Sequence, residues 1–434
     1  MTSNPKKKRN ALPLGRELTR SHTSRSDVVV RDGCSGACQI PVVSQSDCGG
    51  EGRGRGPVPS RSRSATASRS PNAHVTLDSR TLIRDLAAYR EPNSARSMFE
   101  LMITVVPFVL LWVLMWAALD AGYWIGLVLS VPAAGFLVRL FMIQHDCGHG
   151  SFFRRRSMND WVGRVIGVLT LTPYDFWRRS HALHHASSGN LDHRGIGDID
   201  TLTVREYLAL PRWRQLLYRM YRHPVVMFGV GPAYLFILRH RLPMGLMRSG
   251  WQPWVSAMAT NAAIAILVAA IIWLVGVGPF LLVHLPITFL AASLGVWLFY
   301  VQHQFEDTFW EHDHDWTFQG AALHGSSHYD LPGVLRWFTA NIGVHHVHHL
   351  SSRIPYYRLP QVLRDHPQLA AVGRLTPLQS FRCVRMVLWD EKRRRLISFR
   401  EMHAVTSVTR RGMKLSEFTV SFRLHHKSAM IGRV

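Results

Sequence analysis

Eight histidines lie in three short clusters whose spacing could hold metal ions. The last cluster places His345, His348 and His349 at positions i, i+3 and i+4, and the middle one repeats this pattern. On a helix such residues share one face, whereas the neighbouring His346 points roughly 100° away. Three neutral imidazoles aimed at one spot suit a transition metal. The candidate ligands are His145, His149, His181, His184, His185, His345, His348 and His349.

The number and type of these candidate ligands bear on the choice of metal. A structural zinc ion closes its shell with four ligands, often including cysteine. Eight imidazoles with almost no thiolate exceed the needs of one ion. The pattern therefore predicts two ions at a redox site, and nitrogen-rich ligation there favours iron over copper or zinc.

The elements that must position these clusters are strongly apolar. Residues 98–119 read MFELMITVVPFVLLWVLMWAAL, and residues 123–143, 255–275 and 279–300 have the same character. Each is close to the ~20 residues needed to cross ~30 Å of hydrocarbon. We therefore expect an all-α integral membrane protein with four transmembrane helices in two hairpins. A cytoplasmic helical cap would carry the histidine clusters.

This topology brings the clusters together. Two crossings precede the first cluster, and two more separate the second from the third, so all three return to one side of the membrane. The two expected hairpin turns, residues 120–122 and 276–278, contain no Lys or Arg, while basic runs such as residues 154–156 and 392–395 follow the hairpins. The positive-inside rule then places the clusters and both termini in the cytoplasm, with the protein in the cell (inner) membrane.

The net charge of +23 raises the possibility of nucleic-acid binding. No zinc finger, aromatic RNA-binding signature or heptad accompanies the basic regions, so we expect no nucleic-acid partner. Residues 1–76 form a basic Ser/Arg/Gly-rich tail, for which we expect disorder. Residues 77–390 form the membrane domain, and residues 391–434 form a second basic tail.

Several shorter segments carry weaker expectations. Residues 77–95 indicate a short amphipathic helix, and Asp160 to Leu171 indicates a helix lying in the membrane interface. The basic, aromatic stretch from Tyr207 to Arg241 is expected to follow the bilayer surface, with residues 223–238 apolar enough for a re-entrant or buried helix. Five scattered cysteines are not a disulfide framework, and Cys34 and Cys38 offer at most half of a zinc site.

Histidines outside the clusters are interpreted as ordinary hydrogen-bonded or solvated residues, namely His74, His223, His240, His366, His403, His425 and His426. For Asp146 two interpretations stay open, a carboxylate that orients a ligand imidazole or a helix cap. His346 is assigned to the surroundings of the site or to the surface. Glu306, Asp307, His312 and His314 are assigned to a hydrated acidic loop, and His324 and His328 are left unassigned.

The cluster sequences HDCGH, HALHH and HHVHH, separated by membrane hairpins, resemble the membrane fatty acid desaturases over residues 80–385. The runs WLFYVQHQFED (297–307), GSSH (325–328) and NIGVHHVHHLSS (341–352) are similar to bacterial acyl-lipid desaturases. The resemblance implies a non-haem di-iron centre, O₂ as co-substrate and a cis double bond in a long acyl chain as product. It also implies a ninth ligand beyond the last span, which His303 matches. The eight clustered histidines are the other ligands that it implies.

The partners follow from the same considerations. The substrate is expected to be a lipid acyl chain in the bilayer. No His-Pro-Gly-Gly haem signature and no GxGxxG fingerprint in a strand–helix context occurs, so electrons are expected from a separate protein such as ferredoxin or flavodoxin. Its acidic surface would complement the basic face. Two other functions stay open, a membrane di-iron hydroxylase of fatty acids, alkanes or carotenoids, and a histidine-rich metal transporter or receptor.

Overall fold

The structure is a computed structural model that describes residues 79–195 and 197–404. The tail 1–76 and residues 405–434 lie outside the described residues. The residues outside the described ranges include His74, His425, His426, Cys34, Cys38 and Cys48. What the sequence predicts for them remains a prediction.

Four helices among the described residues are long and apolar enough to cross a membrane. They are α2 (Ser94–Ala117), α3 (Tyr123–His149), α9 (Gln252–Val275) and α10 (Val277–His303). A mostly helical fold with four such helices is thereby confirmed. The main difference from the predicted spans is in α3, which continues without a break to His149. The first histidine cluster is therefore the last part of a long helix.

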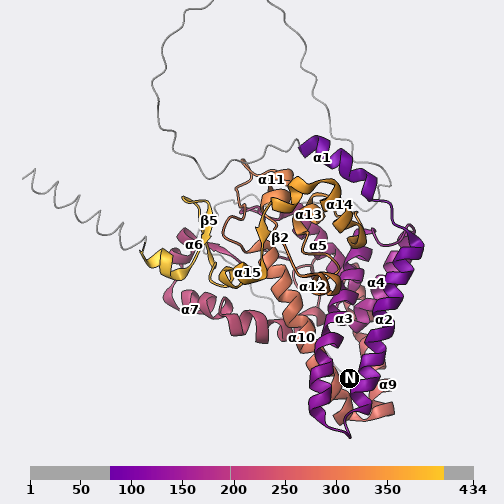
Figure 1. The fold of residues 1–434 in the computed structure, drawn as a ribbon. Coiled ribbons are helices and arrows are strands. Elements are labelled where there is room, and N and C mark those ends of the chain that lie inside the picture. The colour runs from indigo at the N-terminus through magenta and orange to yellow at the C-terminus, as the bar shows by residue number, and fades with distance from the viewer. Residues whose placement is uncertain (1–78, 196, 405–434) are drawn as a thin grey trace, which may run out of the picture. The chain divides into compact units, whose positions relative to one another are not determined.

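The turn between α9 and α10 consists of the single residue Gly276, whose φ is +85°. A side chain would be strained in this backbone region, so glycine permits the abrupt reversal. In Figure 1 the lower ends of the four long helices reach away from the rest of the chain, and the shorter elements gather at the opposite ends, where α3 and α10 finish.

The shorter helices build this second region. Those before α9 are α1 (Ser79–Leu86), η1 (Ala87–Tyr89), α4 (Arg156–Leu169), α5 (Tyr174–Ser187), α6 (Val204–Ala209), α7 (Arg212–Tyr221), η2 (Val226–Val230), α8 (Gly231–Ala233), η3 (Tyr234–Leu238) and η4 (Arg239–Arg241). Those after α10 are α11 (Phe318–His324), α12 (Gly333–Phe338), α13 (His345–Leu350), η5 (Tyr356–Arg358), α14 (Leu359–Asp365), η6 (Pro367–Ala371) and α15 (Pro377–Cys383).

Five short strands connect distant parts of this region. β1 (Leu202–Thr203) pairs in parallel with β4 (Leu388–Asp390), and β4 pairs antiparallel with β5 (Arg395–Ile397). β2 (His328–Tyr329) pairs in parallel with β3 (Arg374–Leu375). These strands are not predictable from the sequence, because pieces of two or three residues carry no recognisable alternation.

The amphipathic helix expected at residues 77–95 is represented by α1 and η1, and the expected interface helix by α4. The apolar residues 226–238 form three short consecutive helices, η2, α8 and η3. This segment is not among the four helices that are long enough to span.

A buried ion pair connects the long helices to the third histidine cluster. Arg139 of α3 bonds to Glu100 of α2 and to the carbonyl of Trp337, and its Nε donates to Thr104 Oγ1 at 3.1 Å. The same Glu100 is 3.2 Å from the hydroxyl of Tyr356. A buried charge needs a partner and further hydrogen bonds, and both are present here. The network therefore fixes the segment that follows α13 against α2 and α3.

Candidate metal centre

Four helices deliver the nine predicted ligands to one place. His145 and His149 lie on the last turns of α3, and His303 is the last residue of α10. α5 carries the middle cluster, and α13 consists almost entirely of the last one. Long helices and short helices therefore meet with their histidines facing inward.

The nine histidines form two groups in which the ligand atoms lie within 4.8 Å of one another. The first group contains His145, His149, His181, His185 and His348. The second group contains His184, His303, His345 and His349. Within the described part of the chain, no other His, Cys, Asp or Glu belongs to either group.

The division corrects one detail of the sequence interpretation. The three histidines of the i, i+3, i+4 pattern were expected to aim at one spot, but the middle residue of each pattern, at i+3, separates from the other two. On α5, His181 and His185 join the first group and His184 joins the second. On α13 the assignment is reversed, since His345 and His349 join the second group and His348 the first. Each of these helices thus contributes to both groups.

Distances between imidazole nitrogens test whether these groups suit a metal. Adjacent Nε2 atoms are 3.0–3.2 Å apart, for example 3.1 Å between His149 and His181 and 3.0 Å between His303 and His345. With metal–nitrogen bonds of about 2.1 Å, ligands at right angles lie about 3.0 Å apart and tetrahedral ligands about 3.4 Å apart. The spacing is of the size expected for imidazoles that share one metal ion.

The electrostatics of the site favour the neutral imidazoles that metal binding requires. Burial, followed by the charges of neighbouring histidines, holds the pKa values of His181, His185, His345, His348 and His349 well below the usual value of a histidine. These rings are therefore unprotonated at neutral pH, and their lone pairs converge on a shared space that a cation would stabilise.

In three of the candidate ligand rings, the Nδ1 atom lies within hydrogen-bonding distance of an oxygen atom. His145 Nδ1 is 3.2 Å from Asp146 Oδ1, His184 Nδ1 is 2.5 Å from Asp198 Oδ1, and His303 Nδ1 is 3.3 Å from the carbonyl of Gly325. A proton on Nδ1 in each contact leaves the Nε2 lone pair free for a metal. These contacts fix both the tautomer and the ring orientation.

The contacts of Asp146 distinguish between its two interpretations. Its Oδ1 faces His145, and its Oδ2 accepts a hydrogen bond of 2.7 Å from the backbone N–H of Tyr356. Both contacts favour a carboxylate that orients a ligand ring over a helix cap. Asp198 was not assigned a role from the sequence, because it lies in a loop 14 residues beyond His184. The only feature of the sequence around it is the presence of two further aspartates nearby, Asp192 and Asp200.

The remaining candidate residues lie outside both groups. His346 is fully buried, so the surface alternative is wrong, and its Nε2 donates to the carbonyl of Leu369 at 2.9 Å. His328 Nδ1 is 2.7 Å from the carbonyl of Ala370. His312 contacts Asp192 on the surface, and Glu306 pairs with Arg395, which agrees with the hydrated acidic loop. Asp307, His314 and His324 are also outside both groups.

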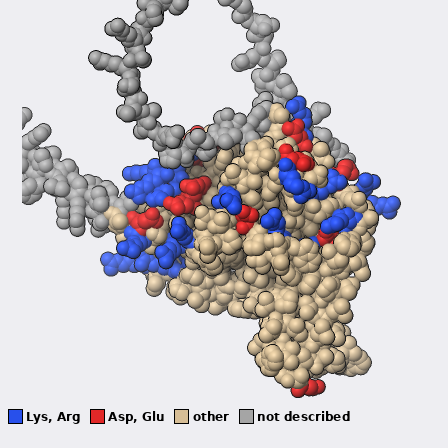
Figure 2. Space-filling view, viewed as in Figure 1, with Lys and Arg blue, Asp and Glu red and all other residues tan. Residues whose placement is uncertain are grey.

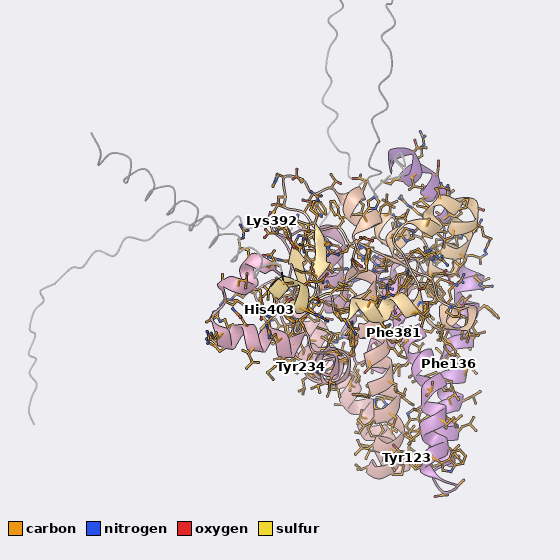
Figure 3. All side chains as sticks on the ribbon, turned by 60° about the vertical axis from the view of Figure 1, so that its left-hand side comes forward. Tyr123, Phe136, Tyr234, Phe381, Lys392 and His403 are labelled. Atoms are coloured by element: carbon orange, nitrogen blue, oxygen red, sulfur yellow. The ribbon has the colours of Figure 1, made fainter. Side chains whose placement is uncertain are left out.

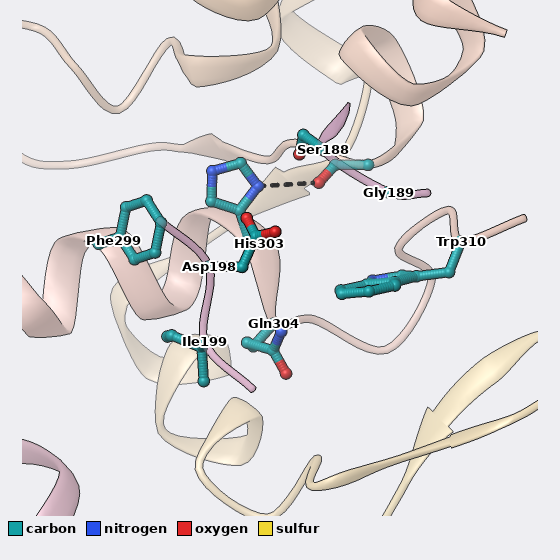
Figure 4. Close-up of a pocket in the computed structure, with 9 residues that line it drawn as sticks. Ser188, Gly189, Asp198, Ile199, Phe299, His303, Gln304 and Trp310 are labelled. Atoms are coloured by element: carbon teal, nitrogen blue, oxygen red, sulfur yellow. Dashed lines mark hydrogen bonds between the residues drawn. The ribbon is translucent and has the colours of Figure 1, made fainter. Parts of the chain in front are cut away.

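A small pocket opens beside the second group. His303 forms part of its wall, and Asp198 lies next to it (Figure 4). The pocket is lined by Ser188, Gly189, Asp198, Ile199, Phe299, His303, Gln304, Trp310 and Gly325. The second group therefore borders a cavity of about 10 Å³, which has room for about one water-sized molecule.

Four long apolar helices beneath two histidine groups define a membrane protein with candidate ligands for two metal ions. Comparisons with known proteins agree with this class. The family model for fatty acid desaturase matches residues 121–377. A fatty acid desaturase of Bacillus subtilis (strain 168) is 45% identical over 321 residues, covering 74% of this chain and 91% of that protein.

Two more distant relatives carry more detailed names. The sn-1 acyl-lipid omega-3 desaturase (ferredoxin) of Synechocystis is 33% identical over 233 residues, which are 51% of this chain and 61% of that protein. The acyl-lipid omega-3 desaturase (cytochrome b5) of Arabidopsis thaliana is 27% identical over 268 residues, which are 57% and 62% of the two chains. The chain belongs to the fatty acid desaturase family, whose members are oxidoreductases.

Proposed function

We propose that this chain desaturates a long acyl chain of a membrane phospholipid, with iron bound at both histidine groups and O₂ as oxidant. The observation that carries the proposal is the pair of histidine groups, the second buried and the first partly buried, beside the ends of apolar helices. The family assignment and the acyl-lipid names of the relatives support the substrate class.

The nine histidines of the two groups are the proposed ligands. Two iron ions held there would supply the O₂ chemistry that removal of hydrogen from an unactivated methylene requires. The balanced reaction converts one –CH₂–CH₂– unit, O₂, two electrons and two protons into a cis –CH=CH– unit and two water molecules. The two electrons come from an external donor, because the acyl chain provides only the other two of the four that O₂ accepts.

The chain's own residues contribute position and environment. Burial of six of the nine imidazoles limits the access of water to the site, and burial holds the rings of His345 and His348 neutral. Asp146, Asp198 and the carbonyl of Gly325 orient three of these rings. The neighbouring methylenes of an acyl chain differ little in reactivity, so the position at which the chain is held selects the carbon.

The proposed orientation puts both histidine groups on the cytoplasmic side of the cell membrane. Figure 2 shows Lys and Arg over the region of short helices, while the opposite ends of the long helices show almost none. The α2–α3 turn there contains Asp120, and Gly276 alone forms the other turn. This asymmetry agrees with the positive-inside rule. A soluble donor such as ferredoxin or flavodoxin would then approach from the basic side.

The test is the fatty acid profile of a host that expresses this chain, measured by gas chromatography–mass spectrometry with double-bond localisation. We expect a new unsaturated acid with the wild-type chain and none with His348→Ala. The matched control is His346→Gln, which changes the neighbouring buried histidine outside the groups and keeps a donor for Leu369. Hydroxylated products in place of a double bond, or equal products from the His348→Ala chain, would contradict the proposal.

A further inference from the structure

Helix α7 presents a continuous apolar stripe that no part of the described chain covers. Trp213, Leu216, Leu217 and Met220 are 59%, 59%, 53% and 53% exposed. Their spacing of i, i+3, i+4 and i+7 places them on one face of the helix. Large apolar side chains in such a row are unfavourable in water and indicate a binding surface.

The opposite face of α7 is firmly attached to the protein. Tyr218 is buried and donates through its hydroxyl to the carbonyl of Val387 at 2.5 Å. Directly after the helix, the buried Arg222 donates to the hydroxyl of Tyr300 and to the carbonyl of Met386. Because these contacts fix the rotation of the helix, the apolar stripe points away from the protein.

Positive charge borders the stripe on both sides. At 100° per residue, Arg212 and Arg214 lie on either side of Trp213, and both side chains are exposed. The guanidinium of Arg214 lies over the Trp213 ring, 5.0 Å from its centre. The sequence contains no Asp or Glu from residue 207 to residue 305. An anionic surface would therefore meet no acidic residue of this segment.

The stripe continues into the segment that leads to α9. Val230, Tyr234 and Leu238 of this segment are 62%, 54% and 61% exposed. In Figure 3, Tyr234 and Phe381 lie at about the height of Phe136, which belongs to the long apolar helix α3. The apolar surface of the four long helices thus extends sideways beneath the region of short helices.

We propose that α7 lies in the plane of the membrane surface and binds anionic phospholipid headgroups. The apolar stripe would enter the acyl-chain boundary, while Arg212 and Arg214 would extend to the phosphate groups. This inference rests on the proposed membrane orientation. It adds a lipid-binding surface outside the histidine site and a preference for anionic lipid.

Spin labelling of the full chain in lipid vesicles tests the placement. Cys34, Cys38 and Cys48 are replaced by Ser, and the buried Cys147 and Cys383 are retained. Single labels are then introduced by Leu217→Cys on the stripe, Ile266→Cys on α9 and Arg205→Cys on α6. We expect the label at 217 to be more accessible to O₂ than to a water-soluble nickel chelate, as at 266, and the label at 205 to show the reverse.

Each outcome has a distinct meaning. A water-accessible label at 217 with a lipid-accessible label at 266 would overturn the placement of α7 alone. Water accessibility at both positions would also overturn the proposed membrane orientation. A short 217–217 distance in double electron–electron resonance would show that a second copy of the chain covers the stripe, which would equally refute the proposal.

A second measurement tests the preference for headgroup charge. Spin-labelled phosphatidylglycerol and phosphatidylcholine are compared for their motionally restricted fractions around the wild-type chain and the Arg212→Gln/Arg214→Gln variant. At low salt, we expect the wild-type preference for phosphatidylglycerol to fall by about fivefold for each arginine removed. The control is Arg205→Gln, an exposed arginine on α6 whose loss should leave the preference unchanged. Equal preferences in all three chains would refute the anionic preference.

Discussion

Replacing Asp198 should weaken metal binding at the second histidine group and leave the first group intact. The Asp198 carboxylate is 2.5 Å from Nδ1 of His184, whose ring is almost fully buried. Without it, the buried Nδ1–H loses its acceptor, which costs about 1–3 kcal/mol. A loss of this size corresponds to a decrease in metal affinity of roughly 10- to 100-fold, the usual effect of removing such a partner.

The Asp198→Asn variant keeps the side-chain size and an acceptor oxygen, so we expect a decrease of about tenfold, and Asp198→Ala should approach the upper end of that range. The assay titrates iron-loaded protein with a chelator and counts the retained iron by mass spectrometry. About half of the iron should become easier to remove. The matched control is Asp192→Asn, which lies in the same loop but contacts the exposed His312.

The outcome separates an orienting role from a purely structural one. Asp198 also accepts a hydrogen bond from the backbone N–H of Gly195 at 3.4 Å, so it could serve only to hold the loop. In that case the melting temperature would fall while the chelator curve stayed like that of Asp192→Asn. Such a result, or equal loss of iron from both groups, would refute the reasoning.

Three further predictions follow from packing and charge. Arg139→Met leaves Glu100 buried beside a single remaining cation, Arg96, so the free energy of unfolding in detergent should fall by about 3–5 kcal/mol. The double variant with Glu100→Gln should recover part of this loss. Gly343 lies two residues before His345, and Gly343→Ala would put a Cβ 2.3 Å from the carbonyl oxygen of Tyr329, so this variant should bind less iron. The control Gly333→Ala, whose Cβ would have no atom within 4 Å, should bind as much iron as the wild type. An unchanged iron content in Gly343→Ala would contradict this prediction. Burial lowers the pKa of His240 to about 3, whereas the ring has a pKa of about 6.5 in the unfolded chain. The unfolded chain therefore binds a proton first as the pH falls below about 6.5, and the free energy of unfolding decreases by about 2 kcal/mol at pH 5. His240→Phe, placed between Phe176 and Phe236, should therefore reduce the loss of melting temperature between pH 7.5 and pH 5, and an unchanged loss would count against it.

The long helices and the convergence of the histidines could be predicted from the sequence, because both depend on strong and local signals. A run of about 20 apolar residues has few alternatives to a span, and an even number of crossings returns each cluster to the same side. The predicted span ended at Ile143, whereas α3 continues to His149, because polar residues after Ile143 mark the end of the apolar run and not the end of the helix. Two opposite charges in apolar helices, Glu100 and Arg139, were the available signal for the buried ion pair.

Contacts between distant segments were not predictable in the same way. Asp198 reaches His184 through a loop whose conformation depends on Gly195 and Gly197, both at positive φ. The pairing of β1 with β4 joins residues more than 180 positions apart. Neither contact has a periodic pattern, since each is set by the packing of surrounding elements.

The division of the histidines between two groups has a geometric cause. Residues at i and i+4 on a helix differ by about 40° in direction, whereas i+3 lies about 60° to the other side. Paired i, i+4 residues therefore stay together, as His181 and His185 do, and the i+3 residue His184 reaches the other group. α5 and α13 do this in opposite senses, so any displacement of either helix moves ligands of both groups at once. The packing of rigid helices would thereby set the separation of two metal ions bound at these groups. The group with four histidines, which borders the pocket at His303, would leave more positions for an exchangeable ligand than the group with five.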